Sequence, residues 1–390
     1  MRRSRVVLVL VSGLSAASVL AGCVANSGAS APPPSLPPSP LIVVTTPVRD
    51  AREVSPAGPV GVIVTGGTLD SVSLTRAGGR PVVGWLTPNR DAWTAGEPLD
   101  FGATYTWSGT ALGPDAGRRD LGGSFTTATP NELVAGSLNV DEGSTVGVAA
   151  PIMLQFDAPI RDRAAAERAL LVQTSVPTEG SWAWLPDSAE GSRVHWRPKN
   201  YWKPGTSVTV TAGLRGVPLG GGAFGQDDIA THFTIGREQI VKADVTSHKM
   251  VVLRDGQPVA TYDASYGRES DPDRVTRSGI HVVTERHPTK RMVSRRYNYD
   301  LVERWAVRIS NNGEFIHANP ASTSAQGNSN ITHGCINLST ADGKHYFDSA
   351  LYGDPVEVTN SSVELSSVDG DIYDWAISWD AWRGMSALPS

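Results

Sequence analysis

The sequence has only two cysteines in 390 residues, and charged residues make up just 19% of it. If one cysteine is consumed near the N-terminus, the remaining thiol has no partner for an internal disulfide. Metal sites built on paired cysteines of the CxxC type are excluded. The net charge is -5, so the chain lacks the overall basic character expected of a nucleic-acid-binding protein. These absences leave one mature thiol whose role must be explained.

Glycine, proline and tryptophan are abundant by contrast, with 40, 27 and 11 copies. Many turn-forming residues combined with many aromatics favour β structure. Apolar residues make up 40% of the chain, which is typical of globular rather than disordered proteins. The length corresponds to about two to four domains. We therefore expect a mainly β protein with several domains.

The N-terminus predicts export and a lipid anchor. A basic start, Arg2 to Arg5, precedes an apolar run, Val6–Ala21, which is shorter than the about 20 residues that span a membrane. The run ends in Leu-Ala-Gly before Cys23, which is typical of a lipobox. Residues 1–22 are then a signal peptide, and Cys23 is lipidated and anchors the chain outside the cytoplasm. The alternative is an ordinary signal peptide with a chance cysteine.

A proline-rich stretch follows Cys23. Residues 32–40 contain six prolines in nine positions, a composition that forms a stiff, extended spacer rather than a packed core. Residues 23–41 are therefore predicted to be a linker between the anchor and the folded domains.

An internal repeat marks the first half of the chain. Trp93 and Trp202 are 109 residues apart, and Phe125 and Phe233 are 108 residues apart, each Trp opening and each Phe closing a similar segment. A unit of about 100 residues fits a seven-stranded sandwich. The alternating β-branched and aromatic pattern of Thr104–Trp107 predicts a strand in the first copy.

Two immunoglobulin-like domains follow from this repeat, at residues 42–128 and 129–236. Ser207–Thr211 predicts a strand in the second copy, and an Ala-rich stretch predicts a helix over Arg161–Leu171. Neither copy gathers the titratable residues that chemistry requires. We expect both to act as a stalk; ligand binding is the alternative.

Residues 237–359 carry further strand signals and form a third predicted domain. Asp255-Gly256 between two apolar runs predicts a hairpin turn. The strands expected in this domain are Met250–Leu253, Val259–Tyr262, Gly279–Thr284, Trp305–Ile309, Phe315–His317 and Pro355–Val358. The basic stretch from His287 to Glu303 is predicted to be a long loop that acts as a lid over a site. A solvated basic loop is the alternative.

The single mature thiol lies in Thr332-His333-Gly334-Cys335. Ser339 is a good N-cap with Asp342 three residues later, so a short helix is expected to begin directly after a turn that holds Cys335. A nearby histidine or the positive end of a helix lowers the pKa of a thiol from about 8.5 and makes it a nucleophile. Glycine at 334 lets consecutive N–H groups point at a developing oxyanion.

Two other interpretations of this cysteine remain open from the residues alone. A lone cysteine is often a small buried core residue. A metal site of His317, His333 and Cys335 is also conceivable, although only one sulfur and no nearby carboxylate are available. An exported free thiol risks oxidation, which favours a functional role for it.

These residues resemble the motif of L,D-transpeptidases with a YkuD-type catalytic domain. His317 and His333 are separated by fifteen residues, an S/T-H-G-C core ends at Cys335, and Asn337 lies two residues further on. The wider order also resembles members of this family, with a lipoprotein signal, two immunoglobulin-like domains, a catalytic domain and a Trp-rich tail. The resemblance covers residues 42 to 390.

The resemblance implies a peptidoglycan enzyme without metal or other cofactor. Cys335 would attack the diamino acid at position three of a tetrapeptide stem, D-Ala would leave, and the amine of a second stem would resolve the thioester into a 3→3 cross-link. His317 would be the general base, oriented by the carbonyl of Ala318. His333 would support the thiolate, and the N–H groups of Gly334 and Cys335 would bind the oxyanion.

The resemblance also assigns residues that bind substrate: Met292, Tyr299, Thr332, Asn337 and Ala318. It implies acylation of the cysteine by carbapenems, attachment to the membrane through the lipid, and no nucleic-acid partner. We expect a monomer on its anchor. The sequence departs from some relatives at Ala321, where they have Trp, and at Ala318, where they have Ser.

Rival functions differ in the residues that they require. An L,D-carboxypeptidase would use the same site with water as acceptor. Papain-type enzymes place their histidine well after the cysteine, whereas only His345 follows Cys335. Sortases need an arginine soon after the cysteine, and none occurs before Arg383. A non-catalytic cell-wall-binding lipoprotein would have no reason to keep both His317 and Cys335.

The C-terminal extension, residues 360–390, is rich in tryptophan. Trp375, Trp379 and Trp382 follow i, i+4, i+7 spacing, which places them on one face of a helix or strap. We expect this face to pack against the catalytic domain; a carbohydrate-binding platform is the alternative.

Overall fold

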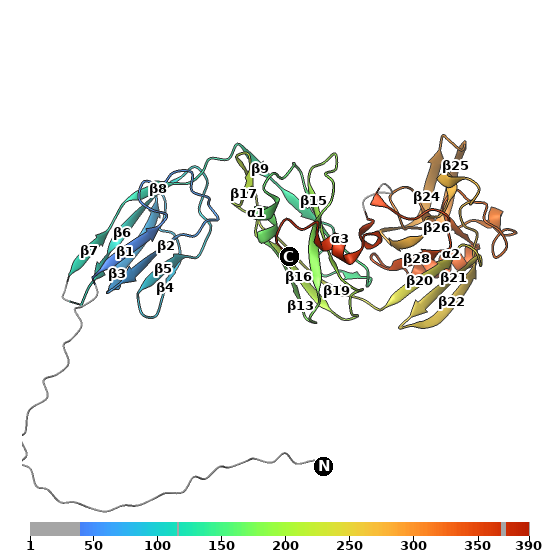
Figure 1. The fold of residues 1–390 in the computed structure, drawn as a ribbon, viewed down its shortest axis with the longest axis horizontal. Helices are drawn as coiled ribbons and strands as arrows, with labels where there is room; N and C mark the ends of the chain where they lie inside the picture. The colour runs from blue at the N-terminus through green and yellow to red at the C-terminus, as the bar shows by residue number, and fades with distance from the viewer. Residues whose placement is uncertain (1–39, 115–116, 368–371, 390) are drawn as a thin grey trace, which may run out of the picture. The chain divides into compact units, whose positions relative to one another are not determined.

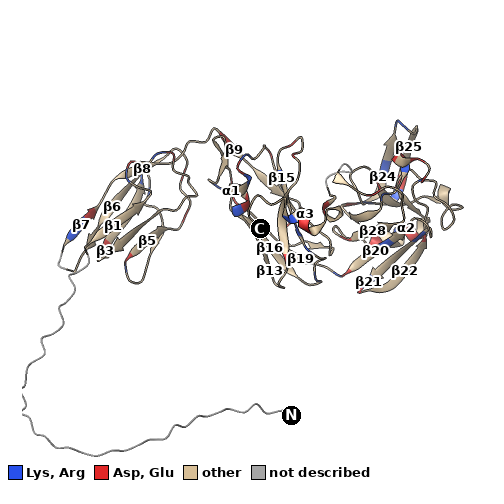
Figure 2. Cartoon of the chain, in the orientation of Figure 1, with Lys and Arg blue, Asp and Glu red and all other residues tan. Residues whose placement is uncertain are grey.

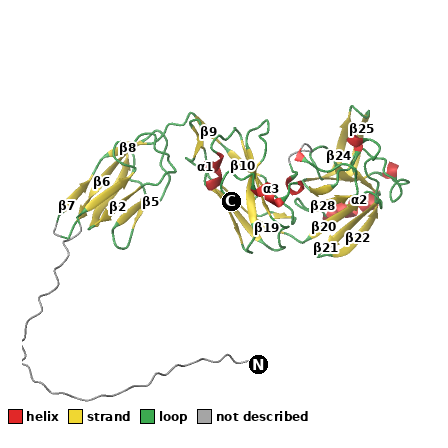
Figure 3. Ribbon diagram, viewed as in Figure 1, coloured by secondary structure: helices red, strands yellow, loops and turns green. Residues whose placement is uncertain are grey.

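The computed structural model describes residues 40–114, 117–367 and 372–389 (Figure 1). The predicted signal peptide, Cys23 and nearly all of the proline-rich linker lie outside these residues. In the part of the chain that is described, no helix is long and apolar enough to cross a membrane. Strands make up most of the regular structure, and the helices are short (Figure 3). The mainly β class predicted from composition is confirmed.

Two sheets form the first sandwich, with strand orders β1-β2-β5-β4 and β3-β6-β7, and β8 pairs with β6. The strands are β1 (Ile42–Thr46), β2 (Gly61–Thr65), β3 (Thr68–Arg76), β4 (Gly84–Leu86), β5 (Ala92–Ala95), β6 (Thr104–Leu112), β7 (Arg118–Leu121) and β8 (Ser124–Thr126). Alternate side chains in the first half of β6 are buried, as the period of two requires. They pack around Trp93, Trp107 and Phe125 in a core of their own.

The second sandwich has sheets of order β10-β12-β15-β14 and β11-β19-β16-β13, with a small sheet β17-β18-β9 beside them. The strands are β9 (Glu132–Val134), β10 (Gly136–Leu138), β11 (Thr145–Val146), β12 (Ile152–Phe156), β13 (Leu170–Thr174), β14 (Gly180–Trp184), β15 (Arg193–Pro198), β16 (Ser207–Ala212), β17 (Pro218–Gly220), β18 (Ala223–Gly225) and β19 (Ile229–Ile235). Its core is separate from that of the first sandwich.

The predicted helix in this sandwich is present but shorter than expected. Helix α1 covers Arg163–Arg168, and the side chain of Asp162 caps it by accepting from the N–H of Ala165 at 2.9 Å. The predicted end at Leu171 is wrong, because Leu170 already pairs with Ala212 as the first residue of β13. Pairing with a neighbouring strand thus outweighs the helix propensity of the last residues.

The two phenylalanines of the sequence repeat lie on the last strand of each sandwich, β8 and β19. Phe125 on β8 pairs with Tyr105 on β6, and Phe233 on β19 pairs with Val208 on β16. Both phenylalanines are buried. The two tryptophans differ, since Trp93 lies on strand β5 whereas Trp202 lies in the loop before β16.

The third part of the described chain has a five-stranded sheet, β22-β21-β20-β28-β23, and a four-stranded sheet, β24-β25-β26-β27. The strands are β20 (Gln239–Asp244), β21 (Lys249–Arg254), β22 (Gln257–Asp263), β23 (Gly279–Val282), β24 (Glu285–Ser294), β25 (Tyr299–Arg308), β26 (Phe315–Ala318), β27 (Ile336–Leu338) and β28 (Pro355–Thr359). Helix α2 (Thr340–Ser349) packs on β25, β26 and β27, and apolar side chains of both sheets share one core. Short 3₁₀ turns η1 (Pro272–Arg274) and η2 (Pro320–Ser322) lie in the connections.

All six strands predicted in this part are present, with ends that differ by a few residues. The Asp255-Gly256 turn joins β21 to β22, and both residues have positive φ, +49° and +74°. This is the combination that a tight hairpin turn requires. The helix cap is also as predicted, because the Ser339 hydroxyl accepts from the N–H of Asp342 at 3.1 Å.

The predicted lid loop at residues 287–303 is instead a hairpin of two ten-residue strands, β24 and β25, which projects from its sheet (Figure 1). Most side chains along both strands are at least partly exposed, so the buried-exposed alternation that identifies strands is weak. Lysine and arginine are concentrated on this hairpin (Figure 2). Their charge is partly neutralised, since Arg291 pairs with Asp300 and Arg296 pairs with Asp273.

The tryptophan face of the C-terminal extension packs on the second sandwich, so its expected packing against the catalytic domain is wrong. Trp382, on helix α3 (Trp379–Arg383), is fully buried beside Ala183 and Leu185, and its indole donates to the carbonyl of Ser181 at 2.9 Å. The beginning of the extension pairs with the third part, where the N–H of Leu365 donates to the carbonyl of Ser278, and residues 374–376 also contact β23.

A buried arginine explains this choice of partner. The guanidinium of Arg197, on β15, lies 4.7 to 5.3 Å from the ring centroids of Trp375, Trp379 and Trp382. The 3₁₀ turn η4 (Asp374–Ala376) brings the carboxylate of Asp374 to 3.1 Å from His195. The spacing of the tryptophans predicted a common face, but the partner depends on His195 and Arg197, and His195 lies 179 positions before Asp374.

Candidate active site

The candidate nucleophile and base lie next to each other because their strands are neighbours. Strands β26 and β27 pair in parallel, with His317 opposite Asn337, and Cys335 comes directly before β27. Gly334 has φ of +107°, a conformation open to glycine and costly for other residues. The chain therefore turns sharply just before the thiol, which is half-buried.

The sequence predicts that the thiol lies on a turn directly before the helix, and this prediction is wrong. Strand β27, Ile336–Leu338, separates Cys335 from the start of α2 at Thr340. The field of a helix end is felt within about one turn of that end, and β27 lies between the thiol and the start of α2 in the chain. The side chain that interacts directly with Cys335 is that of His317.

These residues line a pocket of about 280 Å³. Seven residues predicted for the site line this pocket, among them Met292 on β24. The predicted lining residues are Met292, Tyr299, His317, Thr332, His333, Cys335 and Asn337. The structure adds Tyr297, Leu301, Glu303, Asn319, Ala321, Ser322 and Ile331. Ala318 does not line the pocket but is buried behind it.

His317 is held in one orientation. Its ring is 4% exposed, and Nδ1 donates to the carbonyl of Ala318 at 3.1 Å. Since Nδ1 has this partner, Nε2 is the nitrogen available to the thiol. Burial lowers the pKa of His317, but hydrogen bonding and charge interaction with Cys335 and Glu303 outweigh burial and raise that pKa to about 10. The protonated ring is thus favoured at neutral pH.

His333 has a different environment from the one expected. Its ring lies 4.6 Å from that of Tyr297 and 5.2 Å from that of Tyr299, between centroids. Burial and the charges of Arg274 and Arg268 lower its pKa, so the neutral ring is favoured. His333 therefore forms an aromatic wall of the pocket, and its support of the thiolate stays a prediction.

The remaining predicted residues fix the backbone or face the pocket. The hydroxyl of Thr332 donates to the carbonyl of Cys335 at 2.6 Å and so braces the turn. Asn337 is 4% exposed, and within the described residues its Oδ1 has no hydrogen-bond partner. The pKa of Tyr299 is raised by burial and by the nearby Cys335.

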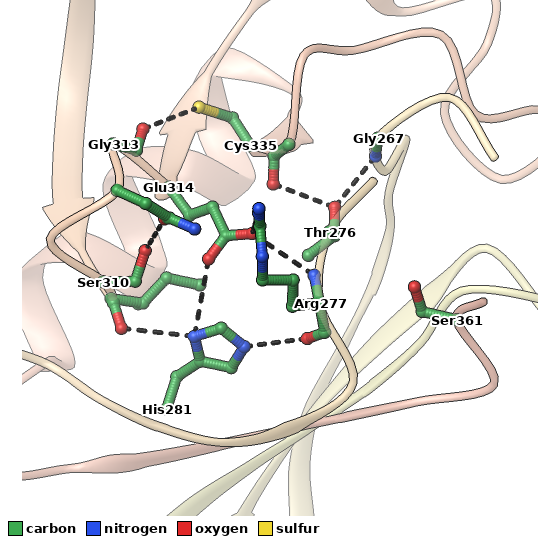
Figure 4. A network of polar contacts seen from close by, with 12 residues as sticks. Gly267, Thr276, Arg277, His281, Ser310, Gly313, Glu314, Cys335 and Ser361 are labelled. Carbon is green, nitrogen blue, oxygen red and sulfur yellow. Dashed lines mark hydrogen bonds and ion pairs between the residues drawn. The ribbon is translucent and has the colours of Figure 1, made fainter. Parts of the chain in front are cut away.

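A network of polar contacts surrounds the backbone that the Cys335 thiol contacts (Figure 4). Cys335 Sγ donates to the carbonyl of Gly313 at 3.8 Å, and the next residue, Glu314, is buried. The Glu314 carboxylate accepts from the backbone and side chain of Arg277 at 3.2 and 3.3 Å and lies 3.7 Å from His281. These contacts fix the turn that carries the Gly313 carbonyl.

A second chain of hydrogen bonds fixes the turn on the other side of the thiol. The hydroxyl of Thr276 donates to the carbonyl of Gly334 and accepts from the N–H of Gly267, both at 2.8 Å (Figure 4). Thr276 and Gly267 were not identified from the sequence. No group of three or more His, Cys, Asp or Glu side chains suited to a metal occurs in the described residues 40–114, 117–367 and 372–389.

Comparison with known proteins agrees with this site. Residues 238–358 match the L,D-transpeptidase catalytic domain, and residues 51–218 match a bacterial Ig domain. The sequence is 51% identical over 354 residues to L,D-transpeptidase 5 of Mycobacterium tuberculosis (strain ATCC 25618 / H37Rv), covering 90% of this chain and 78% of that one. The chain belongs to the L,D-transpeptidase family.

Other relatives of this L,D-transpeptidase agree. It is 36% identical over 405 residues to L,D-transpeptidase 2 of Mycobacterium tuberculosis (strain CDC 1551 / Oshkosh), covering 99% of this chain and 97% of the relative. A solved L,D-transpeptidase in complex with imipenem matches with a TM-score of 0.50 and 34% identity, over 59% of this chain and all of that one. The enzyme class and the combination of Ig-like and catalytic domains inferred from the motif are confirmed.

Proposed function

We propose that this L,D-transpeptidase forms 3→3 cross-links between peptidoglycan stems through an acyl group carried on Cys335. The observation that carries the proposal is the pairing of Cys335 with a buried, oriented His317 in one pocket. A thiol beside such a ring is the arrangement of a nucleophile and its base. No metal and no cofactor enters the proposed reaction.

The first half-reaction forms a thioester. The Cys335 thiolate attacks the carbonyl of the third residue of a tetrapeptide stem. The bond to D-Ala breaks, and protonated His317 gives its Nε2 proton to the departing amine. Because the raised pKa of His317 favours the protonated ring, the donor proton is in place before the amine leaves.

The second half-reaction resolves the thioester. The side-chain amine of a second stem attacks the same carbonyl and gives a proton to His317. The new amide forms as the bond to sulfur breaks, which restores the Cys335 thiolate and the protonated ring. Nδ1 keeps its hydrogen bond to Ala318 throughout, so the ring needs no reorientation between the two halves.

The oxyanion of each tetrahedral intermediate is assigned to the N–H groups of Gly334 and Cys335. Within the described residues neither N–H donates to another group. Their turn is fixed in advance by Thr276 and Thr332, so binding an oxyanion would need no rearrangement.

The donor stem is assigned to the pocket walls. Tyr299 and Met292 from the hairpin line the pocket together with His333 and Thr332. The unpartnered Oδ1 of Asn337 is suited to accept from a stem amide, because a buried acceptor without a partner is costly. Acylation of Cys335 by carbapenems follows from the same role, and a relative solved with imipenem supports it.

Product analysis tests this function against the carboxypeptidase alternative. The full chain is incubated with a tetrapeptide stem, and the products are separated and weighed. We expect a dimer that has lost one D-Ala, together with the free D-Ala. If D-Ala and tripeptide form without any dimer, even at high stem concentration, the enzyme transfers the acyl group to water and the cross-linking proposal is wrong.

We further propose that Cys23 is lipidated and anchors the enzyme outside the cytoplasm, as the lipobox indicates. Replacing Cys23 with serine is expected to move the protein from the membrane fraction to the soluble fraction, or to stop processing, because serine cannot form the thioether. The check is fractionation with mass spectrometry of the N-terminal peptide. An unmodified Cys23 in the wild-type protein, or cleavage at another position, would contradict the anchor.

A further inference from the structure

One charged residue of the pocket has no role in the proposed reaction so far. Glu303, on β25, lines the pocket, and its side chain is only 13% exposed. Its Oε2 lies 3.6 Å from Nδ1 of His317, on the opposite side of the ring from the nitrogen available to the thiol. A carboxylate in this position is unexplained by core packing, since burying one costs free energy.

The backbone of β25 brings Glu303 to this position. Arg304 pairs with Ala318 and Val307 pairs with Ile316, so two residues of β25 stand opposite the single residue His317. This is a β-bulge, a device that re-aims side chains next to active sites. Since Glu303 precedes Arg304 by one residue, it faces the same side of the sheet as His317.

The backbone of the bulge is strained at one residue. Trp305 has φ of +56°, a conformation that a bulky side chain rarely adopts. Its ring packs on Phe347 of α2, with 5.4 Å between centroids, and this contact keeps the residue in place. Strained backbone of this kind is concentrated at functional sites.

No other charged side chain in the described residues forms an ion pair that would explain the burial of Glu303. His317 is its only ion-pair partner among the described residues. Lys290 is its neighbour across the hairpin, but Nζ of Lys290 lies 3.3 Å from His287 and 3.9 Å from Glu285. On the other side of His317, Cys335 is the group that interacts with the ring electrostatically.

We propose that Glu303 is a positioning residue, whose carboxylate orients the His317 ring and stabilises the imidazolium formed when Cys335 loses its proton. The proposal rests on the roles proposed above for Cys335 and His317. The Glu303 side chain keeps its place beside Nδ1 while the proton moves between Sγ and Nε2. The Nδ1 proton remains on the ring, shared between the Ala318 carbonyl and the carboxylate.

The direction of the effect follows from charge. An adjacent anion favours the protonated ring, so Glu303 and the Cys335 thiolate both raise the pKa of His317. Replacing Glu303 with the neutral glutamine should lower that pKa. The alkaline limb of the pH profile, where the ring loses its proton, should then move to lower pH.

The test compares Glu303→Gln and Glu303→Asp with wild type, using the full chain. The rate of adduct formation with imipenem is followed by intact mass from pH 5 to 10. We expect Glu303→Gln to be roughly tenfold slower at neutral pH, the factor that corresponds to about one pKa unit. The alkaline limb should shift to lower pH, and Glu303→Asp should recover part of both changes.

Glu285→Gln is the matched control. Glu285 lies on the same hairpin and contacts a histidine, His287, at 2.6 Å, but it does not line the pocket. This variant should match wild type throughout the profile. A Glu303→Gln enzyme that matches wild type at every pH would overturn the proposal, as would a slower enzyme with an unmoved limb that aspartate does not improve.

Titration of the His317 ring by NMR separates this proposal from the proposed function. In wild type and in Glu303→Gln, the ring resonances are followed against pH. A lower pKa in the variant supports the role of Glu303 even if imipenem fails to acylate the protein, in which case only the proposed function is lost. An unchanged pKa in a variant with wild-type circular dichroism rules the role out.

Discussion

Replacing Cys335 with alanine is expected to abolish acylation and turnover together. The sequence has only two cysteines, and Cys335 is the only free cysteine in the described residues. No other group in the pocket can carry a thioester. The measurement is the intact mass of the protein after incubation with imipenem, where wild type gains one adduct and Cys335→Ala gains none.

The matched control for this prediction is Cys23→Ser. It removes the other cysteine and should leave the adduct on Cys335 unchanged, since Cys23 lies far outside the catalytic segment in sequence. An adduct on the Cys335→Ala protein, located by peptide mapping to any other residue, would show that the nucleophile has been misassigned.

Replacing His317 with alanine is expected to lower turnover by roughly 10²- to 10⁴-fold, the usual cost of losing a general acid–base group. Without the ring, the thiol has no side chain to accept its proton near neutral pH. Acylation should recover in part as the pH rises through about 8.5, where an unassisted thiol ionises. In wild type no such recovery is expected, because the thiol already has a proton acceptor.

His333→Ala is the control for the loss of an imidazole from the same pocket. The pKa of His333 is lowered, so its ring is neutral at pH 7 and makes aromatic contacts with Tyr297 and Tyr299. We expect a smaller loss of rate and a pH profile of wild-type shape. A His333→Ala profile that recovers at high pH as His317→Ala does would mean that the two histidines share the proton transfer.

The residues proposed as nucleophile and base could be identified from the sequence because their signals are local. The spacing of His317 and His333 and the Thr332–Cys335 core identify the family, and short apolar runs identify the strands that carry them. The turn at Asp255-Gly256 and the cap at Ser339 depend on two to four consecutive residues. Such features are fixed by the chain's own conformational preferences.

Features that depend on distant partners were missed. The face of Trp375, Trp379 and Trp382 was predicted, but Arg197, which stacks against it, gives no local signal. The sequence predicts a loop where the hairpin β24–β25 lies, because most of its side chains are charged or exposed. The cap at Ser339 predicts a helix directly after Cys335, but the three residues of β27 lie between the thiol and that helix.

Glu303 shows the same limit within the active site. It lies fourteen residues before His317, within the stretch predicted to be a basic lid, and the neighbouring residues give no sign of a role in the site. Its approach to the ring depends on a bulge, and the bulge depends on where Arg304 and Val307 pair with β26. Register between strands is set by packing across the sheet, which a single sequence does not display.

The central claim is that Cys335 and His317 form one nucleophile–base pair. The rate of acylation by imipenem, measured against pH in wild type and in His317→Ala, tests it most directly. The claim predicts fast acylation of wild type at neutral pH and a slow variant whose rate rises as the pH passes about 8.5. Equal rates for the two proteins across the whole pH range would contradict it.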